Sequence, residues 1–143
     1  MRFMLMVRAT PESESGAQAD PEMLAAMGKF NEEMIKAGVM LAGEGLQPSS
    51  KGARIRFSGH KQTVVDGPFA ETKELIAGFW IIQCKDMDEA LSWAKRVPFD
   101  SGAVELRPFH EPEDFERLVS DEVMAQEQGW RDNQARKAPK TSA

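Results

Sequence analysis

Hydrophobic and polar positions follow two different periods along this 143-residue chain. Runs that are apolar nearly throughout, or that alternate with polar residues, are typical of strands. Four such runs lie at residues 2–8, 39–43, 76–84 and 104–109. Two shorter runs, at 54–57 and 61–65, are joined by Ser58, Gly59 and His60 and predict a β-hairpin. The hairpin is therefore inserted between the second and third of the longer strands.

Apolar residues three or four positions apart predict two amphipathic helices between the longer strands. The first begins at Asp20 and Pro21, where aspartate can cap the helix and proline fits its first position, and it ends at Gly38. The second begins at a capping box formed by Asp86 and Glu89 and ends before a proline.

The remaining segments extend this pattern at both ends of the chain. The polar stretch of residues 10–18 is expected to be a connecting loop, and residues 111–128 are expected to form a further helix. We therefore expect three regions. They are a domain at 1–110, a helical extension at 111–130 and a disordered tail at 131–143.

The order of elements predicts an α+β fold. Two βαβ units with a hairpin between them give the ferredoxin-like sandwich, in which both helices cover one face of the sheet. The other face still carries apolar residues and needs cover. We expect a second subunit to supply most of it, sheet against sheet, so the chain is predicted to form a homodimer.

Composition and charge exclude several classes of partner. The net charge of −5 comes from 23 acidic and 18 basic residues, which argues against nucleic acid. No apolar run approaches the roughly 20 residues of a membrane span, so no membrane partner is expected. The single cysteine, Cys84, excludes an intramolecular disulfide and fits a reducing compartment. We expect a cytoplasmic protein.

Several kinds of catalytic motif are missing from the sequence. There is no glycine-rich phosphate loop, and one cysteine with two distant histidines, His60 and His110, makes no zinc pattern. No serine lies in a nucleophile elbow. Cys84 lies within an apolar strand, which favours an inert core thiol over a nucleophile. We therefore expect no metal and no cofactor.

The most unusual segment is Val64–Glu74, where polar residues separate two apolar strands. Gly67 and Pro68 predict a rigid corner directly after a strand. Asp66 then has two open interpretations: it bonds the backbone of this corner, or it points into a pocket as a catalytic acid or base. The ligand contacts expected in such a pocket are Glu44, Gly67, Pro68, Phe69, Glu71 and Lys73.

The sequence DGPFAETKE at Asp66–Glu74 resembles the signature of DGPF-type proteins in the YCII-related family. Further similarities lie at Phe30–Glu33, 37–46, Gly78–Trp80 and Pro108–Phe109. The resemblance covers roughly residues 1 to 110 and implies a dimeric ferredoxin-like α+β barrel without an assigned activity. Some relatives have a His–Asp pair suggested as an active site, with the histidine on the first helix. That position falls near Ala26 and Met27 here, so the pair is absent.

Two functional hypotheses follow from these observations. The first is a small-molecule binder, or an enzyme of unknown reaction, with its pocket near Asp66. The second comes from the resemblance, because relatives occur near or fused to sigma factors of the extracytoplasmic-function type. It is a non-catalytic partner of a transcription regulator that acts through the acidic body or residues 111–130.

Overall fold

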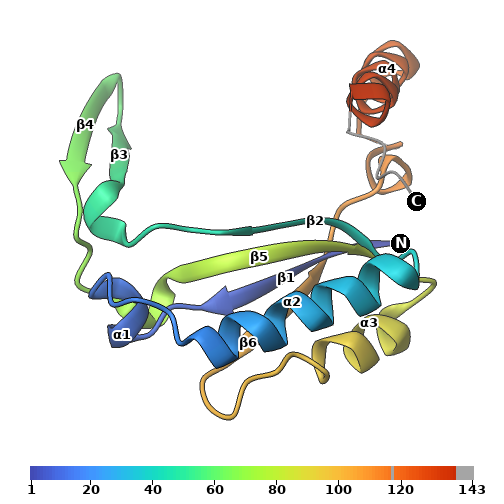
Figure 1. Ribbon diagram of the computed structural model, residues 1–143. Helices are drawn as coiled ribbons and strands as arrows, with labels where there is room; N and C mark the ends of the chain where they lie inside the picture. The colour runs from blue at the N-terminus through green and yellow to red at the C-terminus, as the bar shows by residue number, and fades with distance from the viewer. Residues whose placement is uncertain (117, 138–143) are drawn as a thin grey trace. The chain divides into compact units, whose positions relative to one another are not determined.

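The computed structural model describes residues 1–116 and 118–137. The chain divides into two compact units, Met1–Phe109 and His110–Ala143. The first unit contains a four-stranded sheet, two helices against it and a separate two-stranded hairpin (Figure 1). The second unit contains the C-terminal helix. The predicted mixture of helices with an antiparallel sheet and an added C-terminal helix is confirmed.

The main sheet is built from the four longer apolar runs. Its strands are β1 (Arg2–Arg8), β2 (Met40–Gly45), β5 (Ile76–Gln83) and β6 (Val104–Pro108). They lie in the order β2-β5-β1-β6, and every neighbouring pair is antiparallel. Because β6 is an edge strand, Pro108 can occupy its end without removing a hydrogen bond from the interior of the sheet. The predicted bounds of all four strands are correct to within two residues.

Two amphipathic helices, α2 (Pro21–Lys36) and α3 (Met87–Ala94), lie on the same side of this sheet (Figure 1). Asp20 and Asp86 each accept a hydrogen bond from a backbone N–H of the first turn, at 3.0 and 2.9 Å, so both predicted caps are confirmed. The buried core lies between the helices and the sheet. It consists of Phe3, Leu5, Phe30, Met34, Val39, Trp80, Ile82, Cys84, Ala90 and Ala94.

The two helices leave the opposite face of the sheet uncovered (Figure 1). The strand register places side chains on this face in rows. One row is Glu44, Phe79, Met6 and Glu105, and the next is Ala42, Ile81, Met4 and Arg107. We call the apolar centre formed by Met4, Met6, Phe79 and Ile81 the open sheet face. It is bordered by charges of both signs.

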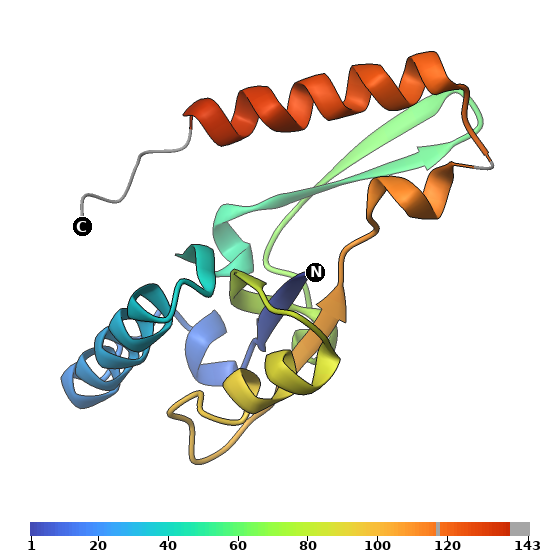
Figure 2. The ribbon, with the colours of Figure 1, turned by 90° about the vertical axis from the view of Figure 1, so that its right-hand side faces the viewer.

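The predicted hairpin is also confirmed. Strands β3 (Ala53–Ser58) and β4 (Lys61–Asp66) pair with each other as a long ribbon that leaves the body of the unit (Figures 1 and 2). Gly59 lies in its turn with φ of +61°, a left-handed conformation that glycine adopts without strain. The described residues also include three short 3₁₀ turns. They are η1 (Ser49–Lys51), η2 (Thr72–Glu74) and η3 (Pro112–Phe115).

The loop predicted at residues 10–18 contains a short helix, α1 (Pro11–Glu14), and this part of the prediction is wrong. Thr10 and Ser13 form a reciprocal capping box. The Ser13 N–H donates to Thr10 Oγ1 at 3.2 Å, and the Thr10 N–H donates to Ser13 Oγ at 2.9 Å. A capping residue followed by proline at the first helical position was the available signal.

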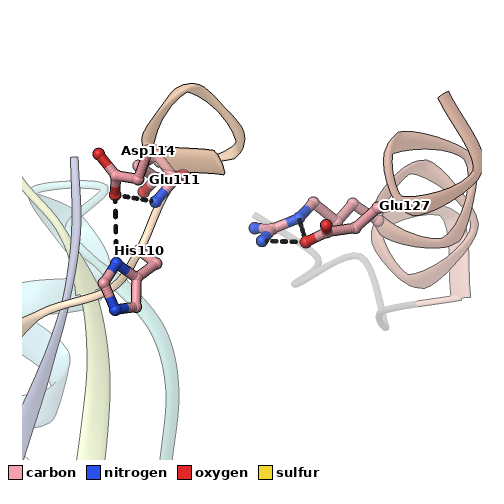
Figure 3. A network of polar contacts seen from close by, with 5 residues as sticks. His110, Glu111, Asp114 and Glu127 are labelled. Atoms are coloured by element: carbon pink, nitrogen blue, oxygen red, sulfur yellow. Dashed lines mark hydrogen bonds and ion pairs between the residues drawn. The ribbon is translucent and has the colours of Figure 1, made fainter. Parts of the chain in front are cut away.

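The second unit differs from the single helix predicted at 111–128. Its first part is the 3₁₀ turn η3, and the helix α4 begins at Asp121 and continues to Lys137. Residues 131–137 are therefore helical where we predicted disorder, because pairs one helical turn apart support them. The Arg131 guanidinium donates to Glu127 at 2.8 Å (Figure 3). Residues 138–143 of the predicted tail lie outside the described residues.

Polar contacts also order the start of this unit (Figure 3). The Glu111 N–H donates to Asp114 Oδ2 at 2.8 Å, and His110 Nδ1 lies 3.5 Å from the same oxygen. The His110 ring also packs against Phe115, with 5.0 Å between centroids. Across the described part of the chain, no helix is long and apolar enough to cross a membrane.

Candidate functional site

The Asp-Gly-Pro-Phe segment, residues 66–69, forms a corner at the base of the hairpin. The Gly67 N–H donates to the carbonyl of Gly52 at 3.0 Å and closes the hairpin base. The Gly67–Pro68 peptide bond is cis. A Cβ atom on Gly67 would lie 1.7 Å from the carbonyl oxygen of Ser49, so only glycine fits there. The predicted corner therefore exists, and backbone contact explains its glycine.

A chain of hydrogen bonds ties this corner to α1. The Phe69 N–H donates to Ser49 Oγ at 3.0 Å. Ser49 in turn donates to the Glu14 carboxylate, through its N–H at 3.1 Å and through its hydroxyl. The Arg54 guanidinium lies over the Phe69 ring, 4.0 Å from its centroid. We call Glu14, Ser49, Gly67 and Phe69 the Ser49 joint, because three separate segments meet at that serine.

Asp66 itself takes no part in the Ser49 joint. It is exposed at the end of β4, opposite Ala53 in the strand register. Within the described residues its carboxylate has no hydrogen-bond or ion-pair partner, and the corner is held by Ser49 instead. Glu71 and Lys73 are also exposed; Glu71 directly precedes the turn η2, and Lys73 lies within it. The roles predicted for these three residues stay predictions.

A cavity of about 250 Å³ lies elsewhere, beside α2 and the ends of β2 and β5. Most of its lining is apolar or glycine. The residues around it are Val7, Met27, Asn31, Gly43, Glu44, Gly45, Ala77, Gly78, Phe79, Trp80 and Phe99. Of the predicted ligand contacts, Glu44 borders this cavity. The other predicted site residues, Asp66, Gly67, Pro68, Phe69, Glu71 and Lys73, are not among the residues that line it.

Missing side chains create the floor of this cavity. Gly45 and Gly78 are register partners, and both share the helix-facing side of the sheet with Val7. A Cβ atom on Gly45 would meet no atom within 4 Å, so its absence leaves open space. A Cβ atom on Gly43 would lie 2.7 Å from the Trp80 ring, so its absence makes room for the indole.

One polar pair forms the wall of the cavity. The Trp80 Nε1–H donates to Asn31 Oδ1 at 2.9 Å, and this bond links β5 to α2. The indole also packs edge-on against Phe30, with 5.6 Å between ring centroids and an interplanar angle of 84°. Within the described residues the amide N–H₂ of Asn31 has no partner. It is therefore available to donate to a ligand.

The strand register separates Glu44 from this polar pair. Glu44 pairs with Phe79, and their side chains share the open sheet face. Asn31 contacts Trp80, whose side chain lies on the helix-facing side. The Glu44 carboxylate and the Asn31 amide consequently belong to opposite faces of the sheet.

Glu14 and Ser49 of the Ser49 joint, and Asn31 and the paired glycines of the cavity, were not predicted as site residues. Glycines two positions apart at Gly43 and Gly45 were a signal that one face of a strand lacks side chains. No comparable signal identified Ser49 or Asn31, because their partners lie 35 and 49 positions away in the chain.

The fold and the cavity define a class: a small mixed α/β protein with a ligand-sized cavity beside its antiparallel sheet. The chain belongs to the YCII-related family, because the model of the YCII-related domain matches residues 1–111. It is also 33% identical over 94 residues to an uncharacterised protein of Rhizobium meliloti (strain 1021). That alignment covers 64% of this chain and 76% of the relative. The predicted family is confirmed, and the DGPF branch stays a prediction.

A solved structure shows a weaker similarity. It is 5-chloro-2-hydroxyhydroquinone dehydrochlorinase from Burkholderia phenoliruptrix AC1100 in complex with 2,5-dihydroxybenzoquinone. The TM-score is 0.37 at 16% sequence identity, over 79% of this chain and 98% of that chain. A score of this size does not establish a common fold, so neither the fold nor the chemistry of that enzyme is carried over.

Proposed function

We propose that this protein binds a small organic molecule in the cavity beside α2. The observation that carries the proposal is that the cavity is lined both by Gly45, above which there is open space, and by Asn31, whose amide N–H₂ has no partner among the described residues. The volume of about 250 Å³ lies just below the usual range for drug-sized ligands, so it suits a smaller molecule. The apolar lining and the amide donor favour an uncharged ligand that carries a hydrogen-bond acceptor.

A substitution of the cavity floor tests this proposal. In Gly45→Ala the new methyl group occupies the open space without touching its surroundings. Gly28→Ala is the matched control, because a Cβ atom on that exposed helical residue also meets nothing. Thermal-shift screening with small carbonyl compounds is expected to find binders. A ligand at 100 times its Kd adds about 2.7 kcal/mol to the free energy of unfolding.

The two variants then separate the outcomes of the screen. A ligand of this cavity loses its thermal shift in Gly45→Ala and keeps it in Gly28→Ala. A ligand that stabilises both variants equally binds elsewhere and contradicts the assignment of the cavity.

We also propose Asp66 as a proton donor or acceptor, with Gly67, Pro68, Phe69, Glu71 and Lys73 as further ligand contacts. The exposed carboxylate of Asp66, which has no partner among the described residues, supports this proposal. At this corner, which is separate from the cavity beside α2, Asp66→Asn is expected to abolish binding or turnover while the melting temperature stays nearly unchanged. If the variant instead loses stability and nothing else, Asp66 belongs to the structure of the corner.

We propose a ferredoxin-like fold from the order of the strands. The order β2-β5-β1-β6, with both helices on one side, supports a ferredoxin-like sandwich. The open sheet face supports a homodimer of the dimeric α/β-barrel type. Sedimentation of the wild type and of Met6→Glu tests this: a dimer in the first and a monomer in the second are expected.

One observation favours the alternative, a non-catalytic partner of an extracytoplasmic-function sigma factor. The helix α4 has no buried residue in its described length, and it exposes Val123 and Trp130. Co-purification with such a sigma factor is expected to fail in Val123→Ser/Trp130→Ala. Equal recovery with the wild type and the variant removes the support for this alternative. In either case we expect a cytoplasmic protein, from its single cysteine.

A further inference from the structure

The β3–β4 hairpin has one apolar face that is exposed to solvent. Ile55 pairs with Val64 in the strand register, and Phe57 lies two residues further along the same face. The exposed fraction is 56% for Ile55, 65% for Val64 and 71% for Phe57. Three adjacent large apolar side chains on one surface are unusual for a chain that works alone.

The hairpin needs a partner for physical reasons. A two-stranded sheet by itself is marginally stable in water and requires packing on one face. Among the described strands, β3 and β4 pair only with each other. Their base is nevertheless fixed, because Gly67 bonds Gly52 and the Ser49 joint holds the residues that follow. The hairpin is thus a rigidly mounted arm with an uncovered apolar face.

The charge of the arm is opposite in sign to the net charge of the whole chain. Its second face carries Arg54, Arg56 and Lys61, and Asp66 is the single acidic residue within 53–66. The whole chain, by contrast, has 23 acidic and 18 basic residues. Because the basic residues lie on the face opposite Ile55, Phe57 and Val64, they favour long-range attraction between the arm and the net acidic chain of another copy, and the apolar face makes the direct contact.

The position of the arm points to the same partner. Within the first unit, the hairpin rises from the end of the sheet on the side opposite α2 and α3 (Figure 1). This is the side of the open sheet face, whose apolar centre the two helices leave uncovered. A second copy seated on the open sheet face would therefore lie beside the arm.

We propose that the β3–β4 hairpin is an arm that clasps a second copy of this chain. Ile55, Phe57 and Val64 pack on the apolar surface of that copy, and the two-fold symmetry of the pair provides a reciprocal arm. The proposal rests on the proposed homodimer and deepens it. It is independent of the ligand cavity, whose Gly45 test does not involve the arm.

Photo-crosslinking locates the arm in solution. The probe is p-benzoylphenylalanine at Phe57, with the same residue at exposed Thr63 on the opposite face as the matched control. Chains labelled with ¹⁵N are mixed with unlabelled chains before irradiation. The probe at Phe57 is expected to give covalent dimers in which a peptide of a labelled chain is linked to a peptide of an unlabelled chain. The yield of these dimers should be well above that from the probe at Thr63.

Dimer affinity supplies the second measurement. Val64→Ser is expected to raise the dimer dissociation constant by about tenfold or more, whereas Thr63→Ser leaves it unchanged. Phe57→Leu keeps an apolar side chain and is expected to retain the dimer, which separates lost contact from lost folding. Melting temperatures of the three variants confirm that each is folded.

The possible results separate the arm from the dimer. Crosslinks confined to one chain, or a Phe57 yield no higher than that of Thr63, overturn the arm while a dimer in sedimentation stands. A wild type that stays monomeric overturns both. Crosslinking of Phe57 to nucleic acid or to an unrelated protein in place of a second copy also overturns the proposal.

Discussion

The corner at residues 66–69 and the cavity beside α2 both depend on glycines, for opposite reasons. At the corner, a side chain on Gly67 would collide with the backbone of Ser49. At the cavity, a Cβ atom on the exposed Gly45 would meet no atom within 4 Å and would project into the open side of the cavity. The first glycine is required by contact, whereas the second provides space. Substitutions at the corner should therefore lower stability, and substitutions at the cavity should lower binding.

The largest expected effect is that of Gly67→Ala. The new methyl group would lie 1.7 Å from a backbone oxygen, which cannot move aside as a flexible side chain can. We expect a loss of about 3 kcal/mol or more in the free energy of unfolding, measured by urea denaturation. Gly28→Ala, on an exposed helical surface, is expected to raise the free energy of unfolding by up to about 1 kcal/mol. A Gly67→Ala protein as stable as the wild type would show that the corner tolerates a side chain.

Ser49→Ala tests the hydrogen bonds of the corner. It leaves the Phe69 N–H without its acceptor and removes one of the two donors to Glu14. The expected loss is about 1–3 kcal/mol in the same denaturation experiment. Glu14→Gln should then lower the free energy of unfolding by less in the Ser49→Ala background than in the wild type, because both residues belong to the Ser49 joint. Additive losses would mean that α1 and the corner are independent.

Asn31→Leu tests the polar pair in the wall of the cavity. The substitution removes the acceptor of the Trp80 indole N–H, so we expect a loss of about 1 kcal/mol in the free energy of unfolding. It also removes the proposed ligand donor, so the thermal shift produced by a cavity ligand should disappear. Indole N–H resonances in an NMR spectrum report the lost bond directly. A variant that binds the ligand as the wild type does would exclude Asn31 from recognition.

The smallest expected effect concerns Cys84, in the core. Burial raises the pKa of its thiol, and the nearby Glu89 carboxylate raises it further. The unfolded chain therefore releases this proton first, from about pH 8.5 upward. The stabilising contribution of the thiol is fully present below that pH and is lost as the pH rises through the folded-state pKa. Between pH 7.5 and pH 9.5, the urea midpoint of unfolding should fall less for Cys84→Ala than for the wild type. Equal falls would mean that the thiol is not desolvated.

The sequence predictions are most accurate for elements that depend on interactions between residues close together in the chain. The caps at Asp20 and Asp86 involve residues two or three positions away, so the sequence reveals them directly. The start of α4 was predicted too early, because Pro112 opens a single 3₁₀ turn that resembles the start of a longer helix. The ion pair of Glu127 with Arg131 carries the helix beyond its predicted end.

The strands, the two capped helices, the hairpin and the corner at Gly67 could all be read from the sequence, because hydrophobic period and turn chemistry act over a few residues. The sequence also identified the family. The contacts of Ser49 with Gly67, of Gly45 with Gly78 and of Asn31 with Trp80 became visible only in the folded chain. These contacts join residues far apart in the chain, and the strand register that creates them depends on how the whole sheet assembles.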